Sequence, residues 1–217
     1  MMKIFMGLCI LALVSCGKDS GNGSGSGMSD QRQDEQGVYR AVLTAVNSGV
    51  SQNASLGTST VKVQGDEFQI KINMTDTPVN VTHLQDIRTG LRCPTKEDDT
   101  NNDGFIDAAE GSKVFGELLI PLDGDLNSQA AENKNLPRSN ASGNYTYSEN
   151  ASLSRLMSDL RTITDRELNL SGRHFVVYSI PETIKLPETV AKLEGLSRNE
   201  SLPIACGKII RILDEEN

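Results

Sequence analysis

The chain has 217 residues, a formal net charge of −8 and two histidines. Its length and its content of 37% hydrophobic residues predict a folded body of one domain or two small ones. The pI near 4.8 argues against nucleic acid as a partner, because phosphate binding needs a basic surface. His83 and His174 are too few for any metal site built from three or more imidazoles.

The first 15 residues have the pattern of a lipoprotein signal peptide. Lys3 precedes an apolar stretch at 4–14, which is shorter than the roughly 20 residues of a membrane-spanning helix and has the length of a signal-peptide apolar region. The segment ends in Leu-Val-Ser followed by Cys16, which resembles the bacterial lipobox. We therefore expect cleavage after residue 15 and lipidation of Cys16. The alternative is an ordinary secretory signal beside an unrelated cysteine.

Residues 16–36 predict a flexible tether. Glycine and serine dominate residues 20–27, and these residue types keep the backbone free. A lipid followed by such a segment would hold a domain close to a membrane of the bacterial cell envelope. Gly17, in place of an aspartate after the lipidated cysteine, resembles the sorting signal for the outer membrane. The membrane is thus the expected partner, and the identity of any protein or envelope partner stays open.

The predicted body, residues 37–217, begins with β-strands. Residues 39–46 and 79–84 have the composition and alternation of strands. Residues 60–63 and 68–72 alternate apolar and polar side chains on either side of Gly65-Asp66. That arrangement predicts a β-hairpin with a short turn.

Residues 99–110 match the calcium loop of an EF-hand. Oxygen-bearing side chains stand at the binding positions, glycine at the sixth position and glutamate at the twelfth. Calcium takes about six to eight oxygen ligands, the glycine permits a sharp turn, and a bidentate glutamate completes the coordination. The expected ligands are Asp99, Asn101, Asp103, the backbone carbonyl of Phe105, Asp107 and Glu110. The alternative is an acidic turn exposed to water.

The surroundings of this loop predict a structural role for calcium. Pro94 disfavours a long helix before the loop, and Gly111 and Gly116 shorten the helix after it. The sequence contains no second loop of this kind. We expect one calcium ion that pins a long loop, with an affinity of about 10⁻⁴–10⁻³ M, as in extracellular modules.

The second half of the body predicts one helix among further strands. Strand patterns occur at residues 115–122, 173–178 and 204–212. After a polar run at 127–150, apolar residues recur with helical spacing at Leu153, Leu156, Met157, Leu160 and Ile163. We expect this short amphipathic helix to dock on the sheet. Many short strands joined by turn-rich segments predict a mainly β fold, an antiparallel sandwich or barrel.

Two cysteines remain for the mature body. Cys9 leaves with the signal peptide and Cys16 carries lipid, which leaves Cys93 and Cys206. An exported protein meets an oxidising compartment, so this pair is a candidate disulfide. The alternative is two buried free thiols.

Three segments, taken in order, form a wider pattern. They are residues 82–90 leading to Cys93-Pro94, residues 172–178, and residues 205–209 with the sequence Ala-Cys-Gly-Lys-Ile. Together they resemble the copper–zinc superoxide dismutase family, and the related chordin-domain group is similar to the same segments. The resemblance implies a Greek-key β-sandwich with a calcium-loop insertion, and independently a disulfide between the two cysteines.

The copper ligands of that family are not retained. In one register Asp86 and Arg88 stand at the first two histidine ligands, and in an alternative register Val81 and His83 stand there. Tyr178 occupies the position of another copper ligand that comes later in the family's sequence. Arg88 would repel a cation placed beside it.

These departures predict a non-catalytic protein. No histidine lies in residues 94–116, where the resemblance would place zinc ligands. We therefore expect a membrane-anchored, calcium-binding lipoprotein with a structural or binding role. The alternative is a metalloprotein with residual copper or zinc binding at His83, acting in metal handling or weak dismutation. We expect His83 to be a hydrogen-bonded structural residue and His174 to point outward.

Overall fold

The structure is a computed structural model that describes residues 32–47, 49–50, 54–127 and 135–212. The predicted signal peptide, Cys16 and the glycine-rich part of the tether lie outside the described residues. Within these ranges, no helix is long and apolar enough to cross a membrane.

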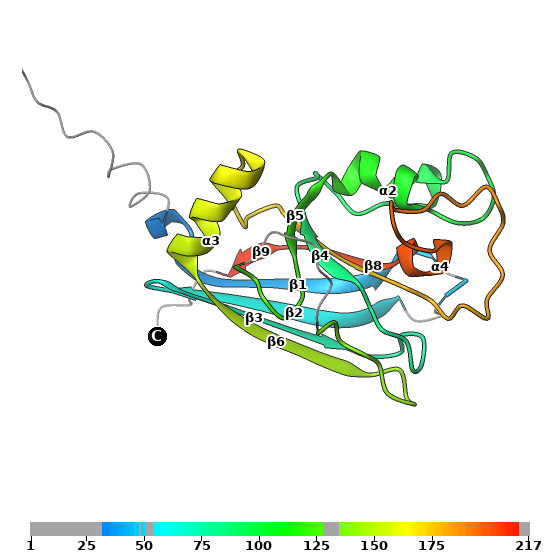
Figure 1. Cartoon of the computed structure of the whole chain (residues 1–217), viewed down its shortest axis with the longest axis horizontal. Coiled ribbons are helices and arrows are strands. Elements are labelled where there is room, and N and C mark those ends of the chain that lie inside the picture. Colours follow the sequence, from blue (N-terminus) through cyan, green and yellow to red (C-terminus); the bar gives the residue numbers. More distant parts are fainter. Residues whose placement is uncertain (1–31, 48, 51–53, 128–134, 213–217) are drawn as a thin grey trace, which may run out of the picture.

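In the described part of the chain, nine strands form one antiparallel sheet. The strands are β1 (Gly37–Ala45), β2 (Ser55–Gln64), β3 (Glu67–Met74), β4 (Gln85–Arg88), β5 (Leu118–Pro121), β6 (Tyr145–Ser152), β7 (His174–Tyr178), β8 (Pro203–Lys208) and β9 (Ile210–Ile212). Their order is β5-β4-β7-β8-β1-β2-β3-β6, and β9 pairs with β1. The sheet curls, so that the short strands β4 and β5 lie over the long strands (Figure 1). The predicted mainly β, antiparallel fold is confirmed.

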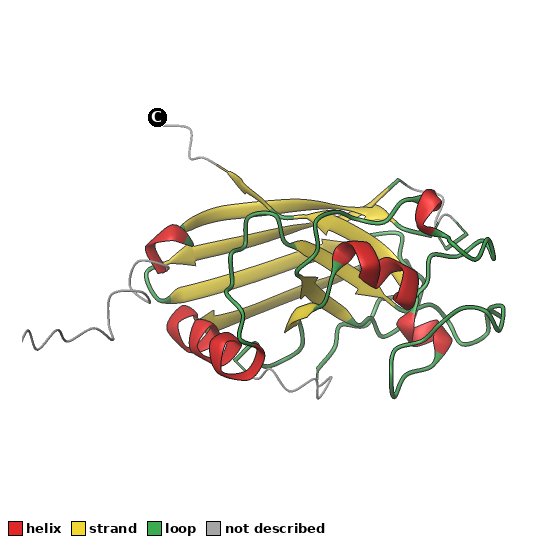
Figure 2. Ribbon diagram, turned by 90° about the horizontal axis from the view of Figure 1, so that it is seen from above, coloured by secondary structure: helices red, strands yellow, loops and turns green. Residues whose placement is uncertain are grey.

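Short helices lie at the two ends of the curled sheet (Figure 2). They are η1 (Lys96–Asp98), α2 (Ala108–Phe115), α3 (Leu153–Asp159), η2 (Leu160–Thr164) and α4 (Arg198–Ser201). Helix α3 lies at one end, and α2 and α4 lie at the other (Figure 1). The end that carries α2 also carries the candidate calcium loop.

The two halves of the sheet enclose one hydrophobic core. Phe68 of β3 belongs to the same buried cluster as Ile87 of β4 and Phe175 of β7. The long strands alternate buried and exposed residues, as expected when one face of a sheet meets the core and the other meets water. The hydroxyl of Tyr147 in β6 donates to the carbonyl of Asp123, at 2.7 Å, and links β6 to the segment after β5.

The predicted hairpin is present. Gln64 of β2 pairs with Glu67 of β3, so the turn contains only Gly65 and Asp66. Gly65 has a φ of 61°, a backbone conformation that glycine adopts without steric cost. The strands predicted at 39–46 and 173–178 correspond to β1 and β7.

Three predicted strands differ from the structure. Residues 79–84 form a turn and a single bridge from Thr82 to Arg138, because Asn80 has a φ of 57° that interrupts an extended chain. The strand predicted from residue 115 begins at Leu118, since Phe115 still belongs to α2. The strand predicted at 204–212 is divided into β8 and β9, and Ile209 between them is buried in the core.

One strand and one apolar residue differ from the predictions because of the elements next to them. Most of strand β6 falls within the polar run expected to be a connection, and β3 pairs with it along its whole length. Ile163 is 62% exposed, although it was expected on the apolar face of the helix. The helix changes there to the wider π-helical turn η2, which rotates later residues off the face set by α3. The other four predicted positions are buried in the core.

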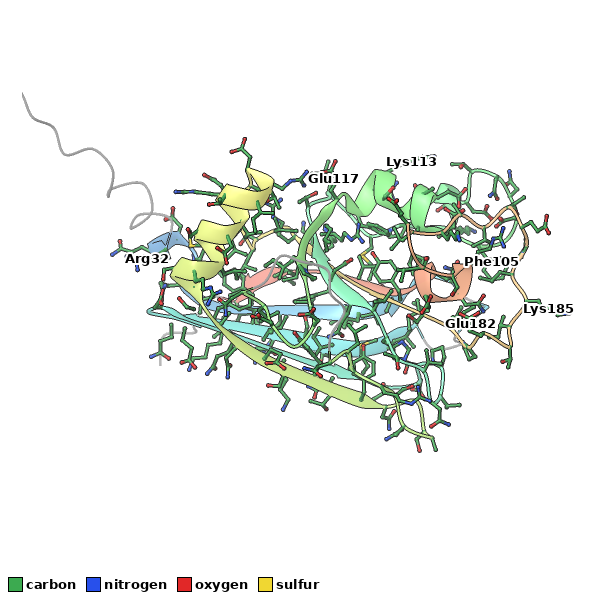
Figure 3. The ribbon with its side chains drawn as sticks, in the orientation of Figure 1. Arg32, Phe105, Lys113, Glu117, Glu182 and Lys185 are labelled. Carbon is green, nitrogen blue, oxygen red and sulfur yellow. A yellow bond between two sulfur atoms is a disulfide. The ribbon has the colours of Figure 1, made fainter. Side chains whose placement is uncertain are left out.

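The residues just before β1 also contact the body. Glu35 is 8% exposed, and its carboxylate accepts a hydrogen bond from the N–H of Leu170, at 3.1 Å. The side chain of Gln36 accepts from the N–H of Gly65, at 2.7 Å. Contacts with the body therefore begin before residue 37. Arg32, at this end, and Phe105, in the candidate calcium loop, lie at opposite ends of the molecule (Figure 3).

Candidate calcium site and the adjoining buried ion pair

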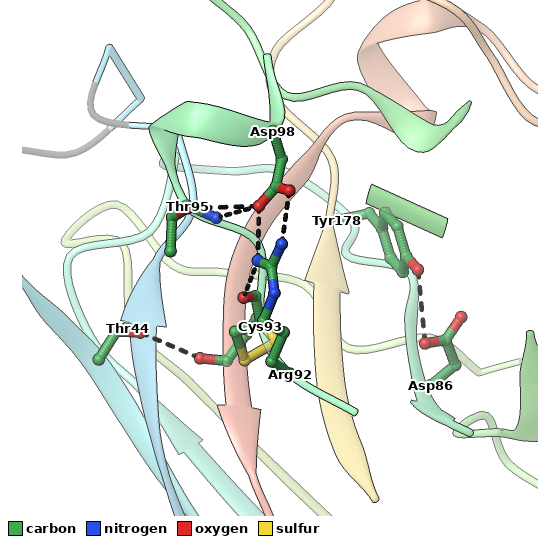
Figure 4. Close-up of a disulfide and its surroundings, with 8 residues drawn as sticks. Thr44, Asp86, Arg92, Cys93, Thr95, Asp98 and Tyr178 are labelled. Atoms are coloured by element: carbon green, nitrogen blue, oxygen red, sulfur yellow. Dashed lines mark hydrogen bonds and ion pairs between the residues drawn. A yellow bond between two sulfur atoms is a disulfide. The ribbon is translucent and has the colours of Figure 1, made fainter. Parts of the chain in front are cut away.

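A disulfide joins the segment before the candidate calcium loop to the sheet. Cys93 and Cys206 of β8 are bonded across 113 sequence positions, with their Cα atoms 5.7 Å apart (Figure 4). The predicted disulfide is confirmed. Cys206 belongs to a small buried cluster with Phe115, Val176 and Tyr178, so the bridge lies in an apolar layer on the outer face of the sheet.

Polar contacts order the short segment between the disulfide and the loop. The Arg92 guanidinium donates to both carboxylate oxygens of Asp98, at 2.6 and 2.7 Å (Figure 4). The N–H of Thr95 donates to the same carboxylate, at 2.8 Å. The hydrogen bond from Arg92 is the main reason that the pKa of Asp98 falls to about 2. Asp98 is therefore ionised at neutral pH, and the chain enters the loop from a single helical turn, in agreement with the effect predicted for Pro94.

Within the loop, side-chain oxygens accept hydrogen bonds from the loop's own backbone. The Asp99 carboxylate accepts from the N–H groups of Asp103 and Gly104, at 3.2 and 2.9 Å. The Glu110 carboxylate accepts from the N–H of Thr100, at 2.7 Å. Gly104 has a φ of 90°, which strongly favours glycine. The first and last predicted ligands therefore both help to close the loop.

The helix α2 begins inside the loop and ends where glycine was expected to end it. Asp107 is its N-cap and accepts from the N–H of Glu110, at 3.0 Å, while the Glu110 carboxylate accepts from the N–H of Asp107, at 3.3 Å. This reciprocal pair is a capping box. Gly116 ends the helix, and Gly111 leaves space that the ring of Phe115 fills, since a Cβ at residue 111 would collide with that ring.

Contacts that we did not predict hold the loop in place. The side-chain amide of Asn47, just after β1, donates to the carbonyl of Ile106 at 3.0 Å and accepts from the N–H of Ile106 at 2.8 Å. From the connection between β7 and α4, the N–H of Ala191 donates to the Asp107 carboxylate, at 2.7 Å. Asn47 lies 59 positions and Ala191 lies 84 positions from its partner, so no local sequence pattern marks these contacts.

The loop carries carboxylates without cationic partners. Asp107 is 2% exposed and Glu110 is 5% exposed. In the described part of the chain, no lysine or arginine forms an ion pair with Asp99, Asp103, Asp107 or Glu110. Buried carboxylates are normally paired with a cation or bound to a metal, so this is the electrostatic setting that a divalent cation would satisfy.

The predicted ligand atoms are oxygens, which calcium prefers, although the side-chain oxygens already accept hydrogen bonds from the loop's backbone. The side-chain oxygen of Asn101 accepts from the N–H of Asp103, at 2.8 Å, and the carbonyl of Phe105 accepts no hydrogen bond from the described residues. Over residues 32–212, leaving out the gaps, no three His, Cys, Asp or Glu side chains lie together in a way that could hold a metal ion. Closure of the loop around calcium stays a prediction.

Three residues aligned with copper ligands by the resemblance meet on the outer face of the sheet. Arg88 donates to one carboxylate oxygen of Asp86 through Nε at 2.8 Å and lies 2.6 Å from it through Nη2. The hydroxyl of Tyr178 lies 3.5 Å from the other oxygen of Asp86 (Figure 4). The first of the two registers therefore brings its residues together with Tyr178. They form an ion pair and a phenol in place of imidazoles.

Arg88 is a buried cation between aromatic rings. Its side chain is 9% exposed, and its guanidinium lies 5.4 Å from the ring centre of Phe115 and 5.7 Å from that of Tyr178. Burial lowers the pKa of Arg88, but the Asp86 carboxylate raises it by more, so the pKa lies above its usual value and the guanidinium stays charged. A second cation placed here would be repelled.

Both histidines are buried. His83 stacks on Tyr145 with ring centres 5.2 Å apart, and its Nδ1 lies 2.9 Å from the carbonyl oxygen of Tyr178. The expectation that His174 points outward into water is wrong, because every residue of β7 is buried. Desolvation lowers the pKa of both imidazoles. Since no cluster of three metal-ligand side chains exists among the described residues, the alternative of copper or zinc at His83 gains no support.

Comparisons with known proteins give similar architectures at low identity. No protein-family model matches the chain, and no curated protein matches its sequence. The Cu/Zn superoxide dismutase from Brucella abortus is 18% identical, with a TM-score of 0.43, over 79% of this chain and 98% of that chain. A SOD-like protein from Bacillus subtilis is 15% identical, with a TM-score of 0.41, over 78% of this chain and 96% of that chain.

Proposed function

We propose that this chain is a non-catalytic structural or binding module with a dismutase-like sandwich, stabilised by calcium and held at a membrane of the bacterial cell envelope by a lipid on Cys16. The observation that carries the calcium site is the pair of buried carboxylates of Asp107 and Glu110, which lack a cationic partner among the described residues. Burial of negative charge without a counter-cation is unfavourable, even where backbone N–H groups donate to the carboxylates as they do here. A calcium ion would supply the missing positive charge with the oxygen ligands that it prefers.

The position of the loop supports a structural role for the ion. The loop is tied to β8 through the Cys93–Cys206 bridge, to the end of β1 through Asn47, and to the connection before α4 through Ala191. Calcium bound to residues 99–110 would therefore order three segments that come from distant parts of the chain. No second loop is needed for this role.

The non-catalytic part of the proposal is supported by Arg88. Its guanidinium, bonded to Asp86, occupies the place that the resemblance assigns to a copper ligand. A fixed positive charge opposes binding of a metal cation there. The chain would thus keep the sandwich as a scaffold without the redox centre.

Thermal unfolding with and without calcium tests the proposed site. At about 10 mM calcium, which is roughly 10 to 100 times the expected dissociation constant, binding should stabilise the wild type by about 1.4–2.7 kcal/mol. For a chain of this size, that gain raises Tm by about 3–10 °C. Asp99→Ala with Glu110→Gln should abolish the shift, because it removes the first and last predicted ligands.

The control is Glu97→Gln, which removes an exposed carboxylate just outside the loop and should leave the calcium shift intact. Magnesium at the same concentration should give a smaller shift, because it demands a tighter octahedral site. An unchanged Tm of the wild type in calcium would overturn the proposal. Equal loss of the shift in Glu97→Gln and in the loop variant would show nonspecific ion binding instead.

A further inference from the structure

A cavity of about 500 Å³ lies on the outer face of the sheet, beside the buried ion pair. Strands β4 and β5 and the end of β7 form its floor, and residues 193–196 form its outer wall. Its apolar lining comes from Leu84, Leu118, Pro121, Leu193 and Leu196. Cavities of this volume, with apolar walls and a few fixed polar groups, are typical of small-molecule sites.

The polar end of the cavity has unused hydrogen-bonding capacity. Both close contacts from Arg88 go to one oxygen of Asp86. Among the described residues, the other oxygen has only the Tyr178 hydroxyl as a partner, at 3.5 Å. Nη1 of Arg88 reaches the carbonyl of Gly116 at the same long distance, 3.5 Å. A ligand could therefore accept from Arg88 and donate to Asp86 without breaking the ion pair.

The charges around the cavity select against ionic ligands. Asp86 and Arg88 neutralise each other, and the remaining charged residue of the lining is Glu194, which is exposed. A ligand ion would therefore lose its hydration beside this pair without gaining a counter-charge of its own, and an anion would also be repelled by Glu194. An uncharged group that both donates and accepts, such as an amide, meets neither penalty.

We propose that this cavity binds a small uncharged molecule with an apolar body and an amide head. The head donates a hydrogen bond to Asp86 and accepts one from Arg88, and the body packs on Leu118, Leu193 and Leu196. The site is separate from the calcium loop and does not depend on calcium binding. It places a ligand on the protein face where the resemblance would place a metal.

NMR titration with three probes of nearly the same shape tests the proposal. Benzamide carries the neutral head, and benzoate and benzylamine carry a negative and a positive head. Benzamide should give saturable shifts in the backbone amide signals of residues 193–196 and Leu118, and it should bind about 10-fold or more tightly than either charged probe. The absence of saturable shifts, or equal binding of benzoate, would overturn the proposal.

Two variants separate binding from folding. Tyr178→Phe removes the hydroxyl that competes for the free oxygen of Asp86, so benzamide binding should be retained or strengthened by up to about 10-fold. Its matched control, Tyr147→Phe, removes a buried hydroxyl on the core side and should leave the affinity unchanged. Asp86→Leu with Arg88→Met replaces the pair by apolar side chains of similar size, so it should fold and lose the preference for benzamide over toluene. A preference retained in that double variant would contradict the assignment.

Discussion

Arg88 and Asp86 form a buried ion pair in which each charge is stabilised by the other. Arg88 and its partner Asp86 are each 7% exposed. If one of the two side chains is removed, little water can therefore reach and solvate the charge that remains. The two rings that flank the guanidinium add cation–π contacts, at 5.4 and 5.7 Å. The pair therefore acts as one unit, and substitution of one member alone differs from substitution of both.

This dependence predicts an unequal effect of single and double substitution. Arg88→Met should lower the free energy of unfolding by about 3–5 kcal/mol, because it leaves the Asp86 carboxylate buried without a counter-charge. Asp86→Leu with Arg88→Met should cost nothing, or should stabilise by up to about 4 kcal/mol, since no charge is then buried. Urea denaturation of both variants and the wild type measures the difference. Equal destabilisation by the two variants would be inconsistent with an uncompensated charge.

The buried histidines predict a loss of stability in mild acid. Desolvation lowers the folded-state pKa of His83 and His174, so the unfolded chain binds protons at a higher pH than the folded chain does. Stability is then fully present above the unfolded pKa of about 6.5 and falls as pH decreases below it. Each imidazole that stays neutral in the fold contributes up to about 1.4 kcal/mol per pH unit. Burial raises the pKa of Glu35, and this carboxyl acts in the opposite sense.

Denaturation between about pH 7.5 and about pH 5.5 measures this effect, because most exposed carboxyl groups titrate below that range. His174→Gln, which cannot titrate, should give a shallower slope than the wild type. A slope that is the same in both proteins would show that folding does not lower the pKa of His174.

At the scale of elements, the disulfide and the candidate calcium loop form one unit. Cys93 precedes the loop, Arg92 and Asp98 order the segment between them, and α2 leads from the loop to β5. The bridge joins this excursion to β8, near the centre of the sheet order. A long loop thus has a covalent attachment at its start and hydrogen-bonded attachments along its length.

Loss of the bridge should therefore be costly. Closing a loop of 113 positions corresponds to about 4–5 kcal/mol in the chain-entropy model. Reduction, or Cys93→Ser with Cys206→Ser, should lower the free energy of unfolding by that amount in urea denaturation. The double variant is also the control, because reductant should not change its stability. A wild type that unfolds at the same urea concentration with and without reductant would contradict this expectation.

At the scale of the whole molecule, the chain has two different ends. The described N-terminal residues lie at the end that carries α3, and the candidate calcium loop lies at the other end with α2 and α4 (Figure 1). If the lipid on Cys16 and the tether hold the N-terminal end near the membrane, the loop end faces away from it. A binding role would then use the distal loops.

This arrangement depends on the predicted lipid, which a pair of cysteine variants tests. Wild type should fractionate with membranes, and mass spectrometry of its N-terminal peptide should show a lipid on Cys16. Cys16→Ser should lose that modification and leave the membrane fraction after processing. Cys9→Ser is the matched control, because residue 9 belongs to the predicted signal peptide and should not affect anchoring. A wild-type N-terminus without lipid would refute the anchor.

Features that depend on neighbours along the chain could be predicted from the sequence. They include the hairpin around Gly65, the strands β1 and β7, the apolar face of α3 and the end of α2 at Gly116. Turn conformation, apolar periodicity and helix termination are local, so a few adjacent residues suffice to specify them. The pairing of Cys93 with Cys206 could also be predicted, because the expected export of the protein and the family resemblance each indicated it.

The tertiary structure alone decided which distant residues meet. It brought Asn47 and Ala191 to the loop, covered His174, paired β6 with β3, and gathered Asp86, Arg88 and Tyr178 beside one cavity. Each of these outcomes depends on strand order and on the curl of the sheet, which place residues side by side regardless of their separation in sequence. The residue types of a calcium loop could be recognised in the sequence. The burial of Asp107 and Glu110 could not be predicted from it, because distant segments of the chain cover them.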